Sequence, residues 1–203
     1  MRKMAALLLI LLVSFPVLVA AQDNPDAESD WGDYSTDYYA SGDQVFTISL
    51  GTVFPTVFIS DNPEFTDHNI DPPIGGMGSL VYSYFFSRYF FAGIELSGLF
   101  LPTLANHTVF LIPLGIRAGT QFVTGRFEFP VFAAFGMAWH KYLDHGYYGI
   151  YARLGAAAFY RVTYDWSFGL TTSWSWFPQR PADSSKNVDG NFLEVTISAR
   201  YHF

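Results

Sequence analysis

The strongest constraint on this chain is an alternation of apolar and polar side chains with a period of two residues. Successive side chains of a β-strand point to opposite faces, so such alternation predicts strands that lie between two unlike environments. No segment keeps a helical period, and we therefore predict an all-β protein. The alternation covers eight segments, namely 44–58, 77–86, 89–101, 109–122, 126–140, 149–161, 166–177 and 192–203.

These segments are long, and their charges all fall on one face. Strands of a common sandwich run about five or six residues, whereas a tilted strand needs roughly nine to eleven to cross a bilayer. An Arg on the lipid face near the midplane would cost roughly 2 to 4 kcal/mol, so the charged face is expected to point inward. The charged residues inside the segments, all on the small or polar face, are Glu95, Arg117, Glu128, Arg153, Glu194 and Arg200.

The connections between the segments alternate in length. Tight turns at 87–88, 124–125 and 162–165 alternate with longer loops at 60–74, 102–108, 141–148 and 178–191. This alternation is typical of transmembrane barrels, which have short periplasmic turns and longer extracellular loops. We predict an eight-stranded antiparallel up-and-down transmembrane β-barrel over residues 44–203. Turn residues Arg88, Arg126 and Arg161 are expected to face the periplasm.

A soluble eight-stranded cup with its aromatic face inward is the main alternative. Six charges are few for eight outward faces in water, and the chain carries 13 Tyr, 21 Phe and 5 Trp. Several of these aromatic residues fall near segment ends, where a membrane barrel has its interfacial girdles. Both observations favour the membrane barrel.

The N-terminal 43 residues differ in composition from the rest. Residues 1–21 have two basic residues, an apolar run and a small-residue cleavage site, which predicts a signal peptide; a transmembrane anchor is disfavoured because the run is short. Residues 22–43 are acidic and predict a flexible tail. The formal net charge of −7, without a basic cluster, excludes nucleic acid as an expected partner. With no cysteine, disulfides and a lipid-modified N-terminal Cys are also excluded.

The C-terminal residues 199–203 resemble the ending of bacterial outer-membrane barrels. This resemblance implies a location in the bacterial outer membrane and an insertion signal, including Tyr201 and Phe203, that the barrel-assembly machinery reads. Within that group, 82–96 resembles the second hairpin of OmpW-like eight-stranded barrels, and 112–114 and 130–137 are similar to the next two strands. The similarity covers roughly residues 75–203.

The OmpW-like resemblance implies passage of small, mostly apolar molecules through the lumen. Candidate lining residues with inward parity are Phe85, Leu111, Phe132 and Phe159. The six charges depart from that pattern and look more like the plugged lumen of OmpA-type or OmpX-type barrels. Glu95 and Arg117, on consecutive strands, are expected to lie directly across from each other.

Two functional hypotheses follow from these features. One is a narrow or gated channel for small, hydrophobic molecules. The other is a non-conducting structural barrel whose long loops bind a host or surface ligand. The expected partners are outer-membrane lipid, the assembly machinery and either a solute or a surface ligand.

Motifs that would indicate metal binding, phosphate binding or catalysis are weak. His140, Asp144 and His145 are too loosely spaced to predict a metal site. The Gly75–Gly78 stretch lacks the Lys and helix of a phosphate-binding loop and is more typical of a strand entry. We therefore predict no catalytic residues, no metal and no cofactor.

Overall fold

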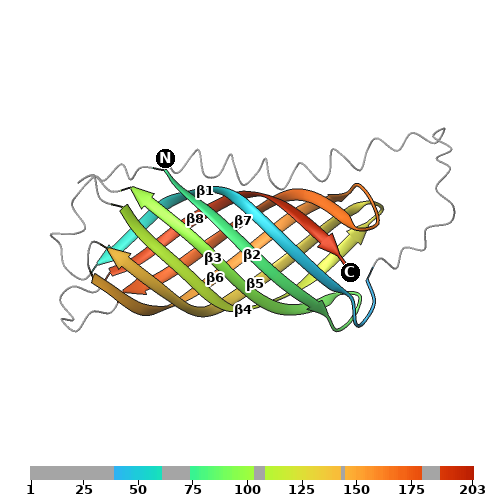
Figure 1. Cartoon of the computed structure of the whole chain (residues 1–203), viewed down its shortest axis with the longest axis horizontal. Helices are drawn as coiled ribbons and strands as arrows, with labels where there is room; N and C mark the ends of the chain where they lie inside the picture. Colours follow the sequence, from blue (N-terminus) through green and yellow to red (C-terminus); the bar gives the residue numbers. More distant parts are fainter. Residues whose placement is uncertain (1–38, 61–73, 103–107, 143–144, 180–187) are drawn as a thin grey trace. The chain divides into compact units, whose positions relative to one another are not determined.

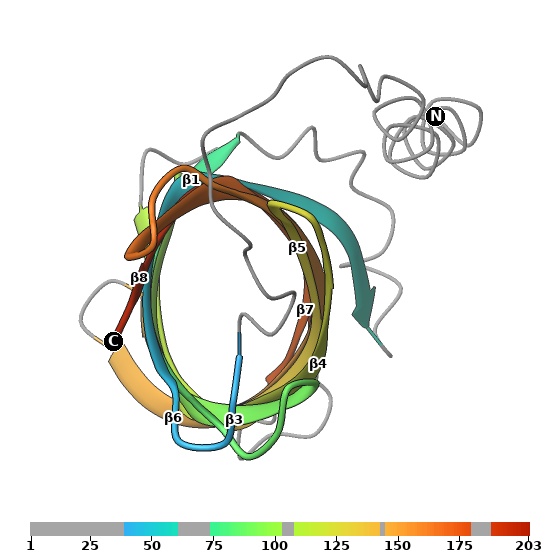
Figure 2. The same cartoon turned by 90° about the vertical axis from the view of Figure 1, so that its right-hand side faces the viewer.

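The protein forms a closed eight-stranded β-barrel. A computed structural model describes residues 39–60, 74–102, 108–142, 145–179 and 188–203. The strands pair antiparallel in chain order, and β1 closes on β8 (Figures 1 and 2). Their bounds are β1 Gln44–Ser60, β2 Gly75–Phe85, β3 Phe90–Pro102, β4 Thr108–Thr124, β5 Phe127–Tyr142, β6 His145–Arg161, β7 Trp166–Gln179 and β8 Val188–His202. The predicted fold class is confirmed.

All eight predicted segments lie within strands or within one residue of them, but several strands run further toward the loop end. The strand β6 begins at His145 instead of 149, and β8 begins at Val188 instead of 192. The alternation of apolar and polar residues is weaker at these positions. The ladder of backbone hydrogen bonds continues, because pairing of the main chain does not depend on the polarity of the side chains. The predicted signal peptide and residues 22–38 lie outside the described residues. No helix among the described residues is long and apolar enough to cross a membrane.

One irregularity interrupts the pairing of β1 with β8. The register shifts between Pro55 and Val57, which leaves Thr56 as the extra residue of a bulge. Proline has no amide hydrogen to donate to the ladder, so a bulge at this position costs little pairing. The Thr56 hydroxyl donates to the Asn191 carbonyl at 3.0 Å and ties the bulge to β8.

Side chains alternate between an apolar exterior and a mixed interior. Large aliphatic residues on the outside are highly exposed, for example Ile116 at 69% and Ile197 at 71%, whereas inward Glu95 is fully buried. The alternative of a soluble cup is therefore wrong, because it requires the opposite orientation of these faces. A continuous apolar exterior of this kind suits hydrocarbon and not water.

The interior is packed in layers along the barrel. An apolar cluster near the loop end includes Leu99, Leu111, Tyr151 and Phe177. Charged residues occupy the middle, and a second apolar cluster with Phe85, Phe91 and Phe132 follows toward the end that carries the short turns and the C-terminus. Glycines on inward positions leave room for these large side chains; a Cβ on Gly119, for instance, would lie 2.8 Å from the Phe91 ring.

Candidate functional site

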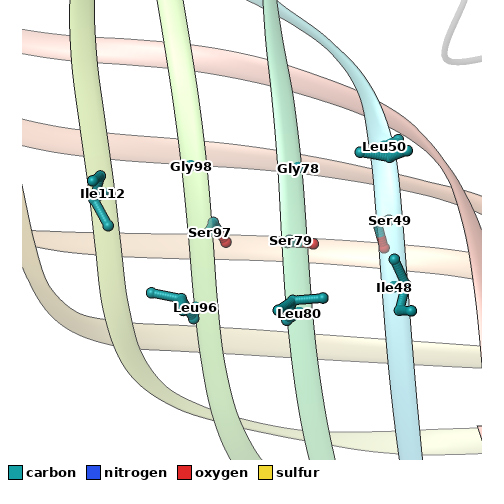
Figure 3. A pocket seen from close by; sticks show the side chains of 10 residues that line it. All are labelled: Ile48, Ser49, Leu50, Gly78, Ser79, Leu80, Leu96, Ser97, Gly98 and Ile112. Atoms are coloured by element: carbon teal, nitrogen blue, oxygen red, sulfur yellow. The ribbon is translucent and has the colours of Figure 1, made fainter.

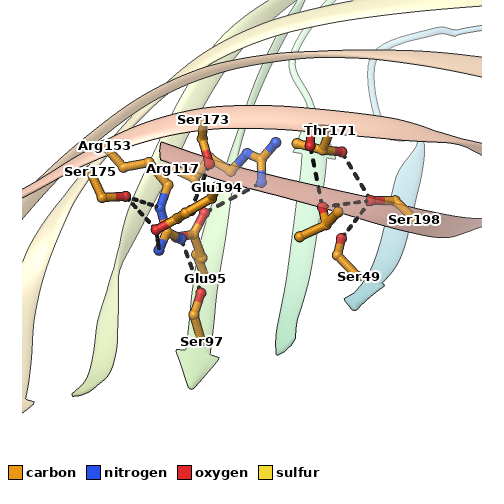
Figure 4. A network of polar contacts seen from close by, with 11 residues as sticks. Ser49, Glu95, Ser97, Arg117, Arg153, Thr171, Ser173, Ser175, Glu194 and Ser198 are labelled. Atoms are coloured by element: carbon orange, nitrogen blue, oxygen red, sulfur yellow. Dashed lines mark hydrogen bonds and ion pairs between the residues drawn. The ribbon is translucent and has the colours of Figure 1, made fainter. Parts of the chain in front are cut away.

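The middle of the lumen holds a set of ion pairs that we call the central network, namely Glu95, Arg117, Arg153 and Glu194. Arg153 of β6 lies at its centre (Figure 4). Its guanidinium pairs with Glu95 of β3 and, at 3.0 Å, with Glu194 of β8, and its Nε donates to Ser175 Oγ at 2.8 Å. This one side chain thus links β6 to β3, β7 and β8.

Arg117 completes the central network from β4. Its Nη1 lies 3.3 Å from Glu95 Oε2, and its guanidinium carbon lies 3.2 Å from the centre of the Phe132 ring. Two serines, Ser173 and Ser175, donate to Glu194 at 2.6 and 2.7 Å. With two carboxylates against two guanidinium groups, the network is neutral, which is how charges are tolerated away from water.

The pairing of Glu95 with Arg117 differs from the predicted geometry. Glu95 lies opposite Gly115, and Arg117 lies opposite Gly93, so the two charges are diagonal neighbours and not directly across from each other. The expectation of direct opposition was wrong because it assumed a symmetrical loop, and the loop centre lies one residue earlier. Their long side chains still meet, since the residues opposite them are glycines.

A second set of contacts, which we call the terminal network, lies nearer the C-terminus and comprises Tyr39, Glu128, Arg161, Arg200 and His202. Glu128 is its acceptor. Arg161 Nε donates to it at 2.7 Å, Arg200 Nη1 at 3.0 Å and the Tyr39 hydroxyl at 2.7 Å. His202 contributes a ring nitrogen 3.2 Å from the same hydroxyl. Four donors, the fourth being Ser167 at 3.1 Å, therefore satisfy one buried carboxylate.

Tyr39 reaches this network from outside the strands. Its ring stacks on Phe85 with centroids 4.2 Å apart, and only 3% of the residue is exposed. The turn that follows is fixed by Gly42, whose φ of 107° favours glycine and whose amide donates to the Phe85 carbonyl. Burial raises the pKa of the Tyr39 hydroxyl, which keeps it protonated as a donor to Glu128.

Sequence reasoning named Glu128 and Arg200 among the lumen charges and missed the other three members of the terminal network, Tyr39, Arg161 and His202. Residues 39–43 were assigned to the flexible tail because the surrounding composition is acidic, yet Tyr39 packs into the barrel end. Arg161 was expected to face the periplasm from a short turn; instead it lies in β6 and is buried against Glu128. Its even spacing from Arg153 could have revealed its inward orientation.

The four apolar residues proposed as a lining all point inward and are buried, but each has its own partners. Phe85 stacks on Tyr39, Phe132 on Arg117 and Phe159 on Arg200, whose guanidinium carbon lies 4.0 Å from the ring centre. Leu111 belongs to the apolar cluster near the loop end. A cavity of ≈ 10 Å³ beside Phe85 has room for about one water molecule.

Of the three residues of the weak metal motif, only His140 has a described side chain. His140 is buried in β5 with its ring 6.0 Å from that of Phe177, and His145 begins β6. Asp144 lies outside the described residues. Within the described parts of the chain, no group of three or more His, Cys, Asp or Glu could hold a metal ion. Residues 75–78 form the first part of β2, as expected for a strand entry.

The C-terminal strand closes the barrel. The Phe203 amide donates to the Gln44 carbonyl at 3.0 Å, and the outward Tyr201 ring lies 5.0 Å from that of Trp166 and 4.9 Å from that of Phe203. These rings form an aromatic group at the end of the barrel that holds the short turns. Recognition of Tyr201 and Phe203 by the assembly machinery stays a prediction.

Comparison with known proteins agrees with this architecture. A protein-family model matches residues 23–201, and the chain belongs to the family that this model describes. An uncharacterized protein of Treponema pallidum (strain Nichols) is 26% identical over 129 residues, which make up 64% of this chain; the chain spans 59% of that relative's length.

Two solved structures are similar in fold. Neisserial surface protein A is 12% identical, with a TM-score of 0.61 over 81% of this chain and 99% of that chain. The outer membrane protein OprG from Pseudomonas aeruginosa is 11% identical, with a TM-score of 0.50 over 83% of this chain and 99% of that chain. These two likenesses confirm the predicted fold, a small barrel of the outer-membrane type.

Proposed function

We propose that the protein resides in the bacterial outer membrane and acts as a non-conducting barrel that anchors its longer loops at the cell surface. The exposed aliphatic exterior supports a membrane location, because such a surface in water would promote aggregation. The signal-peptide pattern and the aromatic C-terminal residue support export to the outer membrane.

The central network is the observation that carries the non-conducting assignment. Arg153 bridges β3 and β8 from β6, so its side chain crosses the lumen. A solute moving through would have to separate these buried pairs, and breaking such a pair by removing one partner costs about 3 to 5 kcal/mol. An eight-stranded barrel has an interior that its own side chains can fill, which fits this packing.

The gated channel predicted from the sequence is the competing proposal. In its favour, the contacts that close the middle of the lumen join side chains. A gate could therefore open by rearranging those side chains, without separating any pair of strands. Phe132 and Phe159 pack against Arg117 and Arg200, so both rings are engaged by cations and do not offer a free apolar lining to a hydrophobic solute. This observation favours the closed barrel.

An enzymatic role is not part of the proposal. The barrel fold hosts several functions and does not by itself decide this point. The proposed partners are membrane lipid and a host or surface ligand of the longer loops, including 61–73 and 180–187, which lie outside the described residues. No cofactor is proposed.

Single-channel recording in planar bilayers tests this function. We expect no conductance from the parent protein. The double variant Glu95→Ala, Arg117→Ala removes one charge of each sign and keeps the Arg153–Glu194 pair, so it should conduct. Thr171→Ala, which removes an inward hydroxyl bonded to Ser198 at 2.9 Å, is the matched control and should stay closed. Sustained conductance of the parent would instead establish the channel.

The membrane orientation has its own test. Spin labels at Ile94 and Leu170, which are 59% and 57% exposed, should report contact with acyl chains in reconstituted vesicles. Labels that report water at both positions would refute the proposed membrane location.

A further inference from the structure

The outer wall of the barrel contains a groove at a pair of glycines. Gly78 of β2 lies directly opposite Gly98 of β3, and both occupy outward positions. The groove has a volume of ≈ 320 Å³ (Figure 3). Its outward lining is completed by aliphatic side chains from β1 to β4, namely Ile48, Leu50, Leu80, Leu96 and Ile112.

Neither glycine is required by the local backbone, and Gly98 is not required by close packing either. The described glycines with positive φ are Gly42 and Gly125, so Gly78 and Gly98 have ordinary strand conformations. A Cβ on Gly98 would meet nothing within 4 Å, and a Cβ on Gly78 would lie 3.2 Å from the flexible end of Leu50. Because glycine weakens a strand, its presence here points to something that approaches the backbone closely.

The neighbouring glycine shows that the barrel can cover such a gap with its own side chain. Gly76 lies opposite Phe100, one outward pair further toward the loop end. The Phe100 ring lies over Gly76, where it would collide with an added Cβ. No described side chain covers Gly78 and Gly98 in this way, so the groove stays open to the exterior.

The chemistry of the groove identifies its occupant. No ionisable residue lines it, and two of its three serines direct their hydroxyls to interior partners: Ser97 accepts from Arg153 at 3.0 Å, and Ser49 accepts from Ser198 at 2.8 Å. A free fatty acid would therefore have no partner for its carboxylate. A hydrocarbon chain whose headgroup lies outside the groove has no such requirement.

We propose that this groove binds one acyl chain of a membrane phospholipid and retains that lipid more strongly than the lipid around the barrel. The proposal rests on the membrane orientation given above, since the groove opens onto the apolar exterior. In a membrane, close van der Waals contact at small residues is what favours one neighbour over another. A chain that fills the groove contacts backbone at the glycine pair and the flanking aliphatic side chains.

Native mass spectrometry of the full-length mature protein, released from detergent micelles containing palmitoyl-oleoyl phosphatidylethanolamine, tests the proposal. We expect the parent to retain one phospholipid. Gly98→Leu should lose it, because the new side chain fills the groove. Ala118→Leu, which adds the same side chain at an exposed position of β4, should retain it. Circular dichroism verifies that both variants fold, and Gly98→Ala provides a milder variant with partial loss.

Three results would overturn the proposal. Equal retention by the parent and Gly98→Leu would show that the groove does not hold the lipid. A dimer of the parent that Gly98→Leu abolishes would assign the groove to a second copy of the chain. Preferential retention of added palmitate would assign it to a free fatty acid. If the label at Ile94 reports acyl chains while retention is equal, only the groove proposal fails, and the membrane orientation stands.

Discussion

Replacing Tyr39 by Phe isolates the part that one hydroxyl plays in the terminal network. The substitution removes the hydroxyl that donates to Glu128 at 2.7 Å and leaves the ring free to stack on Phe85 at 4.2 Å. Because the ring is buried and Phe has almost the same shape, packing should be preserved. The change in the free energy of unfolding therefore reports the contacts of the hydroxyl, namely its hydrogen bond to Glu128 and its contact with His202 Nδ1 at 3.2 Å.

The expected size of the effect follows from the partners of Glu128. A hydrogen bond to a charged group contributes about 1.5 to 3 kcal/mol. Glu128 keeps donors from Arg161, Arg200 and Ser167, so we expect the low end of this range. A loss of about 1.4 kcal/mol corresponds to a tenfold change in the folding equilibrium constant. The lost hydroxyl cannot be replaced by bulk water, since the site is enclosed.

Tyr82→Phe is the matched control. The Tyr82 hydroxyl also donates at 2.7 Å, but its acceptor is the neutral Gln44 side chain and the bond is exposed. We expect a loss of no more than about 0.5 kcal/mol there, at the lower limit for hydrogen bonds between neutral groups. Urea unfolding of protein folded into lipid vesicles, followed by tryptophan fluorescence, measures both. Equal losses in the two variants, or none in Tyr39→Phe, would refute the role assigned to Tyr39.

Two further predictions concern the central network and the glycines. Arg153→Met should lower the free energy of unfolding by about 3 to 5 kcal/mol, because Glu194 keeps only serine donors; urea unfolding measures this, and a neutral result would contradict the buried ion pairs. Gly169→Ala should cost about 1 to 3 kcal/mol, since its Cβ would lie 2.7 Å from the Phe159 Cα, whereas Gly98→Ala should be neutral or stabilising. The same unfolding assay compares the pair, and equal effects would show that close packing does not distinguish these glycines.

The sequence was sufficient for the strands and their faces because both depend on local alternation. A period of two assigns every residue of a strand to one face, so the inward orientation of Glu128 and Arg153 follows without knowledge of any neighbour. Tight turns likewise indicate which strands are consecutive. Strand ends were less accurate, as at His145, because alternation fades there while backbone pairing persists.

Partners across the lumen could not be predicted in the same way. Contacts such as those of Arg153 with Glu95 and Glu194 join strands β3, β6 and β8, and they depend on the stagger of all the strands between them. The centre of the loop between β3 and β4 lies one residue earlier than assumed, so Glu95 and Arg117 are not directly opposite each other as predicted. The position of Tyr39 could not be predicted for another reason: nothing in an acidic segment indicates that one aromatic ring enters the barrel.

The same network that blocks the lumen also specifies how the barrel closes. A shift of β6 by one residue against its neighbours would place Arg153 toward lipid, at a cost of roughly 2 to 4 kcal/mol near the midplane. A shift by two residues would keep it inside but move it away from Glu194 and Ser175, and leave a buried charge without its partners. Apolar side chains on the exterior cannot discriminate against the two-residue shift, because they still face lipid after it. The buried ion pairs are therefore the interactions that select one register among those that lipid alone would accept.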